Sequence, residues 1–276
     1  MPIIHITDEQ IHELKEWFDS YTSDILEAQH GDEHILLKIE HTKRVCDEIE
    51  MLGRSIELDQ DALRLANIIA LFHDIGRFDQ FVAYKTFVDR DSVDHAQHGV
   101  GLLTSLSLFD SFSDTVTSTI LTAVEHHNKA YLPDLPEEVL LYAKLIRDAD
   151  KLDIYKVVTD YYQRTKPEEN RVIQLGLPDT DGVSPAVVRD LLEQRIVLSE
   201  HLQNLNDFKL GQAAWVFDCN FPATYKEINK RDYLEILKNQ LPETEQITTL
   251  FQDLHAYLSG NPTSPIIKTN PCRMIP

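Results

Sequence analysis

The stretch that decides the fold runs from Ile68 to Phe81 and reads IIALFHDIGRFDQF. Its apolar half stops abruptly at His73 and Asp74, which predicts a buried helix that ends in an imidazole and a carboxylate. A carboxylate removed from water is costly unless a partner satisfies it, and a metal ion binds imidazole and carboxylate together. A His-Asp hydrogen bond or a helix cap would also satisfy an isolated pair, so the pair alone does not predict a metal site.

Two other predicted helices carry histidines in similar positions. His41 lies in the apolar stripe of a helix expected from about Glu33 to Leu52, although a single histidine there is also compatible with an ordinary core residue. Asp94 is placed to cap a helix that begins at His95. His98 follows three residues later, so it is expected on the same helical face as His95.

Two further helices bring polar residues to the end of an apolar face. The apolar face of the helix expected over 113–127 leads to His126 and His127. Pro136 opens the next helix, and Asp150 occupies a position on its inner stripe. Five helices therefore direct imidazoles and carboxylates toward one interior, which predicts a metal site. This donor set without thiolate suits Fe, Mn, Co, Ni, Zn or Mg.

The net charge, the cysteines and the apolar runs exclude several classes of protein. The formal net charge is −20, which opposes binding to a nucleic-acid duplex because phosphate backbones attract clustered Lys and Arg. The three cysteines, Cys46, Cys219 and Cys272, are widely spaced and include no CxxC pair, as expected in a reducing compartment. No signal peptide and no apolar run of about 20 residues is visible, so we expect a cytoplasmic protein that does not enter a membrane.

Helical periodicity dominates the chain and predicts an all-α fold in two parts. Residues 1–164 are expected to form a helical core with the metal site, and residues 165–276 a helical extension packed on that core. The boundary is the stretch Thr165–Ser184, where Pro, Gly, Asp and Asn accumulate. Ile75–Ser92 lacks a clean period and is expected to be an ordered loop, and the Pro-rich tail from about Gly260 is expected to be extended or disordered. The helices expected in the extension are approximately 185–204, 207–220, 223–241 and 243–258.

The order His…His-Asp…Asp resembles the HD-domain superfamily of metal-dependent phosphohydrolases over about His41 to Asp150. ALFHDIGRF is similar to the helix end of that family, and Asp150-Lys151 within RDADKLD is similar to its terminal metal aspartate. The resemblance implies an all-α HD-domain helical bundle. It also implies a small phosphorylated substrate, with nucleotides as one candidate class.

The middle of the chain resembles the two-metal branch that includes the HD-GYP phosphodiesterases. HAQHGVGLL places His95 on a ligand position of that branch, and EHHN matches its paired histidines, His126 and His127. The G-Y-P signature is absent, since the chain reads NKAYLPDLPEE there, and Leu37 stands where a third ion would need a carboxylate. We therefore do not extend the expectation to cyclic-di-GMP hydrolysis or to a trinuclear site.

The resemblance implies two divalent ions about 3.5–4 Å apart that share a water, lower its pKa and direct the bridging hydroxide at phosphorus. Asp74 would bridge the ions, and His98 or His127 would protonate the leaving oxygen. Arg77, Lys85 and Lys151 would hold phosphate unless they form ordinary salt bridges. The implied metal ligands are His41, His73, Asp74, His95, His126, His127 and Asp150. The implied catalytic residues are Asp74, Arg77, His98, His127 and Lys151.

Two other functions remain open for the same residues. A comparable His and Asp set holds two irons in HD-domain oxygenases such as the inositol oxygenase group. An HD module without catalysis could instead bind a nucleotide as a sensor, although a complete ligand set weighs against that function. Neither the identity of the substrate nor the oligomeric state is readable from the sequence.

Overall fold

The computed structural model describes residues 5–164 and 174–260, and within these ranges the chain is helical and contains no β-strand. The N-terminal helices are α1 (Asp8–Ala28), α2 (Glu33–Ser55), α3 (Gln60–Phe72), α4 (Gly76–Tyr84), the 3-10 turn η1 (Asp89–Asp91), α5 (His95–Ser105), α6 (Asp114–His126) and α7 (Glu137–Tyr162). The C-terminal elements are α9 (Pro185–Leu192), η2 (Ser199–His201), α10 (Leu205–Ala213), η3 (Ala214–Asp218), α11 (Pro222–Lys230), α12 (Tyr233–Lys238) and α13 (Glu245–Ser259). The expected all-α fold is confirmed over the described residues.

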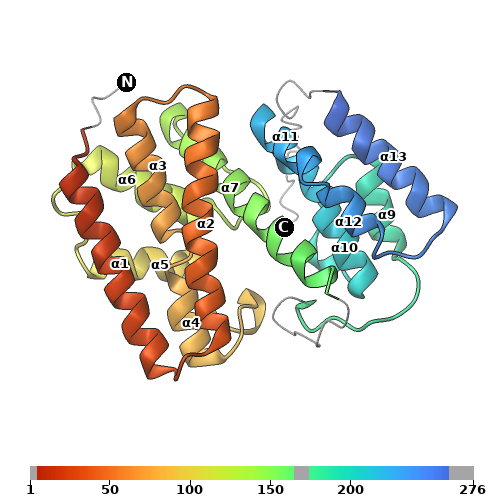
Figure 1. Ribbon diagram of the computed structural model, residues 1–276, viewed down its shortest axis with the longest axis horizontal. Helices are drawn as coiled ribbons and strands as arrows, with labels where there is room; N and C mark the ends of the chain where they lie inside the picture. The colour runs from red at the N-terminus through yellow and green to blue at the C-terminus, as the bar shows by residue number, and fades with distance from the viewer. Residues whose placement is uncertain (1–4, 165–173, 261–276) are drawn as a thin grey trace, which may run out of the picture.

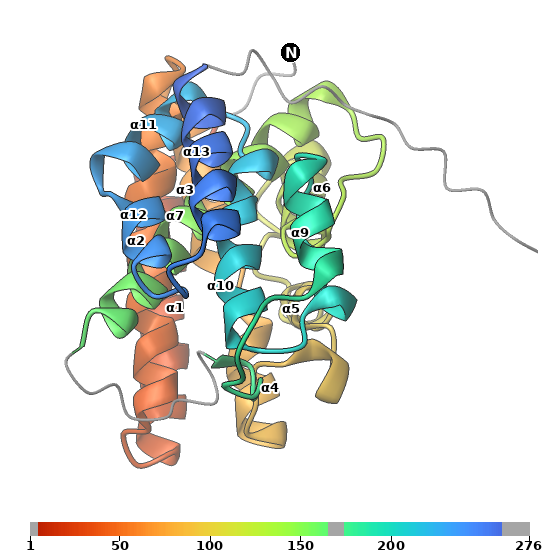
Figure 2. The same cartoon turned by 90° about the vertical axis from the view of Figure 1, so that its right-hand side faces the viewer.

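Helix α7 is the element that joins the two groups of helices. Helices α1 to α6 lie on one side, α9 to α13 lie on the other, and α7 runs from the first group into the second (Figure 1). It packs against α2, α3 and α6 and also against α11 and α12. The turned view shows α10, α12 and α13 in front of α2 and α7 (Figure 2). Helix α7 is therefore contacted by both groups of helices.

The sequence explains where the site-bearing helices begin. Thr7 forms a capping box with Gln10, and Asp59, Asp94 and Ser113 each accept backbone N–H bonds at the starts of α3, α5 and α6. Helix α3 is buried over nearly its whole length, so the Ile68–Phe72 run sits in the middle of the core. The end of α3 consequently delivers its polar residues into the interior of the bundle.

The segment expected to be a loop is partly helical. Gly76–Tyr84 forms α4, and η1 follows within the remaining connection to α5. Phe78 and Phe81 are buried one turn apart along α4, so a short helix already buries the aromatic residues of this segment. With only nine residues, α4 is too short to show a clear period in the sequence.

The C-terminal helices are shorter than expected. The segment predicted over 185–204 is helical only to Leu192 before η2 begins, and the segment predicted over 223–241 divides at Asp232. Asp232 adopts the left-handed conformation with φ 54°, which ends α11 and starts α12 in a new direction. The tail predicted beyond Gly260 lies outside the described residues. No helix in the described ranges is long and apolar enough to span a bilayer.

Candidate metal centre

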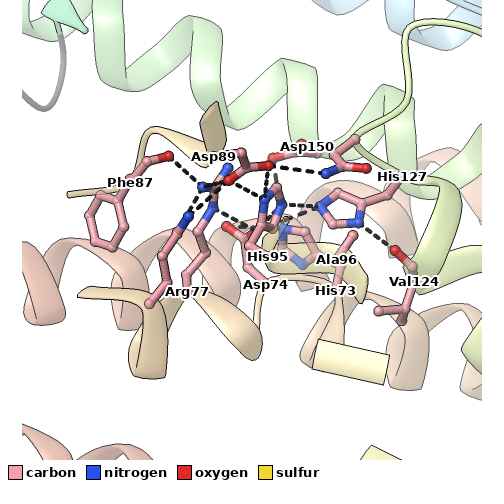
Figure 3. Close-up of polar contacts among 12 residues, drawn as sticks. His73, Asp74, Arg77, Phe87, Asp89, His95, Ala96, Val124, His127 and Asp150 are labelled. Atoms are coloured by element: carbon pink, nitrogen blue, oxygen red, sulfur yellow. Dashed lines mark hydrogen bonds and ion pairs between the residues drawn. The ribbon is translucent and has the colours of Figure 1, made fainter. Parts of the chain in front are cut away.

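His73 and Asp74 occupy the turn between α3 and α4, and both side chains are buried. The Nδ1 of His73 donates to the carbonyl of Ala70 at 2.7 Å, so the imidazole is held by its own helix. The two carboxylate oxygens of Asp74 face different directions, and each lies near a different pair of imidazoles. This turn is the centre around which the other polar residues gather (Figure 3).

The first imidazole pair faces Asp74 Oδ2. His41, from the middle of α2, places its Nε2 3.3 Å from Nε2 of His73. Asp74 Oδ2 lies 3.5 Å from the first of these atoms and 3.7 Å from the second. Asp150 Oδ1 of α7 lies 3.2 Å from His41 Nε2 and 3.7 Å from His73 Nε2. Asp150 therefore lies against both imidazoles of this pair, and it also forms a possible ligand group with His73 and His127.

The second imidazole pair faces Asp74 Oδ1. His95 is the first residue of α5, His127 follows the last residue of α6, and their Nε2 atoms lie 3.1 Å apart. Asp74 Oδ1 is 3.3 Å from His95 Nε2 and 3.6 Å from His127 Nε2. Asp74 thus contacts one imidazole pair through each of its oxygens.

The outer nitrogens of the four imidazoles all face hydrogen-bond acceptors. His127 Nδ1 is 2.7 Å from the Val124 carbonyl, His41 Nδ1 is 2.7 Å from Asp153, and His95 Nδ1 is 2.7 Å from Asp89. Carbonyls and carboxylates only accept, so each Nδ1 carries a proton, and in the uncharged form that binds a metal each ring would direct an Nε2 lone pair inward. Lone pairs that face each other at 3.1–3.3 Å cannot hydrogen-bond, and they fit a cation between them.

The electrostatics of the cluster keep its carboxylates ionised. Burial by itself would raise the pKa of Asp74, but the Lys38 ammonium, His73 and Arg77 hold it well below its usual value. Burial opposes ionisation of Asp150 in the same way, but the adjacent His41 and His73 imidazoles outweigh it, so its pKa is also lowered.

Burial and the nearby Arg77 lower the pKa of His95 to about 4. At neutral pH this imidazole is therefore uncharged, which is the form that binds a metal. Asp89, the partner of its Nδ1, is partly exposed and also accepts from Arg77 and Gln80.

Two predicted site residues lie apart from the cluster. His98 is 41% exposed on α5 and its Nε2 faces Asp79 at 3.2 Å, so the helical spacing from His95 does not bring it to the centre. His126, one residue before His127, belongs to none of the His and Asp groups close enough to share an ion, and its buried Nδ1 lacks a hydrogen-bond partner in the described part of the chain. His127 is the member of this histidine pair that faces Asp74.

The predicted phosphate-binding cations have protein partners, and Lys85 donates to the side chain of Gln29 at 2.6 Å. Lys151 Nζ lies 2.7 Å from Asp218 of η3, and Arg77 Nη1 donates to Asp89 at 2.7 Å and to the Phe87 carbonyl at 2.5 Å. Both side chains are only partly buried. Lys151 and Arg77 therefore form ordinary salt bridges, which were the alternative to phosphate binding.

Several residues near the centre are not apparent from the sequence. Lys38 Nζ contacts Asp74 Oδ2 at 2.7 Å from a position three residues before His41 on α2. Asp153 occupies the same face of α7 as Asp150, three residues later. Lys38 and Asp153 each lie three residues from a predicted ligand on the same helix, so helical spacing could have identified them. Asp89 lies in the connection before α5, where no helical periodicity points to it.

A separate group of possible ligands, formed by Asp89, Asp94 and His95, has its oxygens already in use. Asp94 accepts from Lys129, and Asn128 bridges Asp89 and Asp94 at 3.3 and 3.1 Å. These contacts support the His95 imidazole and leave no free ligand oxygens there.

Comparison with known proteins gives one match. The family model described as HD domain matches residues 39–155, which include every clustered residue from His41 to Asp150. The resemblance to the HD-domain superfamily is therefore confirmed, while the HD-GYP branch stays a prediction. No curated protein and no solved structure matches the chain.

Proposed function

From the HD domain at residues 39–155, we propose that this protein is a metal-dependent phosphohydrolase acting on a small phosphorylated substrate. The observation that carries the proposal is the position of Asp74 between two imidazole pairs, with one oxygen toward each pair. A carboxylate in that position can bridge two cations, and the His and Asp donors suit divalent ions such as Mn, Fe, Co, Ni, Zn or Mg.

The proposed ligand sets follow the two faces of Asp74. The first consists of His41, His73 and Asp150 with Asp74 Oδ2, and the second consists of His95 and His127 with Asp74 Oδ1. Six of the seven predicted ligands are therefore retained, and His126 is left out because it belongs to neither group. When bound, such ions supply positive charge that lowers the pKa of water and neutralises phosphoryl oxygens.

The chain's own residues would bind and orient the substrate. Asp150 is the most exposed of the clustered side chains, at 18%, so the first ligand group is the part of the centre closest to solvent. Lys38 lies on this side with its ammonium against Asp74, and an anionic phosphoryl group could exchange with Asp74 as its partner. Lys151 offers a second cation on α7, although it would have to leave Asp218 first.

A metal and activity screen tests the proposal. Protein purified with and without oxygen would be analysed for bound metals and assayed on phosphomonoesters and phosphodiesters with added Mn, Co, Ni or Mg. A chelator-treated sample is the control. We expect hydrolysis of a phosphoester that chelation removes and one of these ions restores.

Other outcomes would identify a different function. Two irons per chain with an oxygen-sensitive absorption band and no hydrolysis would contradict the proposal and indicate an oxygenase. Tight nucleotide binding without turnover under any metal condition would indicate a sensing module.

A further inference from the structure

Each half of the proposed centre contains one imidazole whose Nδ1 faces a carboxylate from outside its own helix. In the first half, His41 Nδ1 lies 2.7 Å from Oδ2 of Asp153, which is fully buried on α7. Arg44 of α2 clamps that carboxylate, with Nε 2.5 Å from Oδ1 and Nη2 3.0 Å from Oδ2. Imidazole, carboxylate and guanidinium therefore form a continuous chain from the centre outward.

The second half repeats this arrangement with different elements. His95 Nδ1 lies 2.7 Å from Oδ2 of Asp89, and Arg77 Nη1 donates to Oδ1 of the same carboxylate at 2.7 Å. Gln80 adds a bond to Asp89 Oδ1 at 2.9 Å. The connection between α4 and α5 is thereby fixed against the imidazole (Figure 3).

The other imidazole of each half is held locally. His73 and His127 donate to the carbonyls of Ala70 and Val124, each three residues earlier in the chain. These bonds follow automatically from the ends of α3 and α6. The His41–Asp153 bond, by contrast, spans 112 residues. Each half therefore combines one imidazole held by a neutral carbonyl three residues earlier with one imidazole held by a carboxylate from another element.

We propose that Asp153 with Arg44, and Asp89 with Arg77, are two positioning pairs, each orienting one metal-binding imidazole of its own half of the centre. The inference rests on the proposed metal-dependent function. A carboxylate on Nδ1 fixes the tautomer and ring orientation and makes Nε2 a stronger donor. The guanidinium holds the carboxylate in place through directional bonds that lysine cannot reproduce.

Asparagine substitutions separate this role from simple packing. Asp153→Asn and Asp89→Asn keep the side-chain shape but remove the charge. The new amide can also donate to Nδ1, which favours the tautomer with its proton on Nε2 and removes the ligand lone pair. Asp160→Asn is the matched control, because Asp160 lies on α7 with Asp153 but is 54% exposed and forms an ion pair with Lys156 rather than with a clustered imidazole.

The experiment is a Co²⁺ titration of chelator-treated full-length protein, followed by visible absorption. Wild type should bind two ions. Asp153→Asn should weaken one binding step by about 10–100-fold and change its absorption band, and Asp89→Asn should do the same to the other step. The Co²⁺ affinity of Arg44→Lys should lie between those of wild type and Arg44→Met. The affinity and spectrum of Asp160→Asn should match those of wild type.

Two results would overturn the inference while leaving the proposed function intact. In the first, both Asn variants bind two Co²⁺ ions with wild-type affinity and spectra, even if their metal-free forms unfold more easily. In the second, each variant weakens both steps equally, which would contradict the assignment to separate halves. Failure of wild type to bind Co²⁺ or any of the other divalent ions named above would instead refute the proposed function itself.

Discussion

Gly76 and Gly99 meet backbone to backbone where α4 packs on α5. A Cβ on Gly76 would lie 2.7 Å from the Gly99 amide nitrogen and 2.2 Å from the carbonyl oxygen of His95. Real Cβ atoms do not approach backbone this closely, so a side chain at Gly76 would push the two helices apart. The contact places the start of α5, and therefore His95, beside Asp74.

Gly76→Ala is expected to separate α4 from α5 and displace His95. Overpacking of this kind typically costs about 1–3 kcal/mol of unfolding free energy. Gly101→Ala is the control, because Gly101 is an exposed residue of α5 with open space around its Cβ position. That change should be neutral or stabilising by up to about 1 kcal/mol. Urea unfolding measures both, and equal effects of the two variants would contradict the close-packing account.

The C-terminal helices support the centre through Asp218. Arg147 of α7 donates to the carbonyl of His127 at 3.2 Å and to Asp218 Oδ2 at 2.5 Å. The turn that carries His127 is therefore joined to η3 by one guanidinium. Burial would raise the pKa of Asp218, but Lys151 and Arg147 outweigh it and hold the pKa below its usual value.

Asp218→Asn should therefore destabilise the protein in a pH-dependent way. Because the folded-state pKa is below the unfolded value of about 3.9, the charged form stabilises the fold above that pH. This contribution is lost as the pH falls through the folded-state pKa. We expect a loss of about 1.5–3 kcal/mol at pH 7, and a smaller loss below pH 4, in unfolding experiments on chelator-treated protein. If the difference in unfolding free energy between wild type and Asp218→Asn does not change with pH, the ion-pair explanation is contradicted.

Cys46 and Cys219 are expected to react slowly with alkylating reagents in the native protein. Burial raises the pKa of Cys46 to about 12 and raises that of Cys219 well above its usual value, so neither forms much thiolate near neutral pH. Iodoacetamide treatment at pH 8 followed by peptide mass spectrometry should show little label at these two positions until urea is added. Rapid native labelling of Cys219 would contradict the packing around η3.

Helical periodicity in the sequence is the feature that predicts the all-α fold and most of the clustered residues. Apolar stripes that end in His or Asp identify the buried ends of α3 and α6, so His73, Asp74 and His127 are recognisable from their neighbours. Periodicity does not separate His126 from His127 at a helix end. It also places His98 with His95, although at the first turn of α5 only His95 turns inward.

The contacts that support the ligands are less accessible from sequence. Asp153 and His41 lie 112 residues apart, and only the packing of α2 on α7 brings them together. Asp89 lies in an irregular connection, and α4 is too short to show a period. Residues that act through tertiary contacts therefore require the structure, whereas residues on a helical stripe do not.

The central claim is that Asp74 serves both halves of the centre at once, and the metal content of Asp74→Ala tests it most directly. Wild type, Asp74→Ala and the control His98→Ala would be purified identically, checked for helical content by circular dichroism, and analysed for bound metals. The account predicts about two ions per chain in wild type and in His98→Ala, and neither ion in folded Asp74→Ala. Unchanged metal content in Asp74→Ala would contradict the bridging role of Asp74.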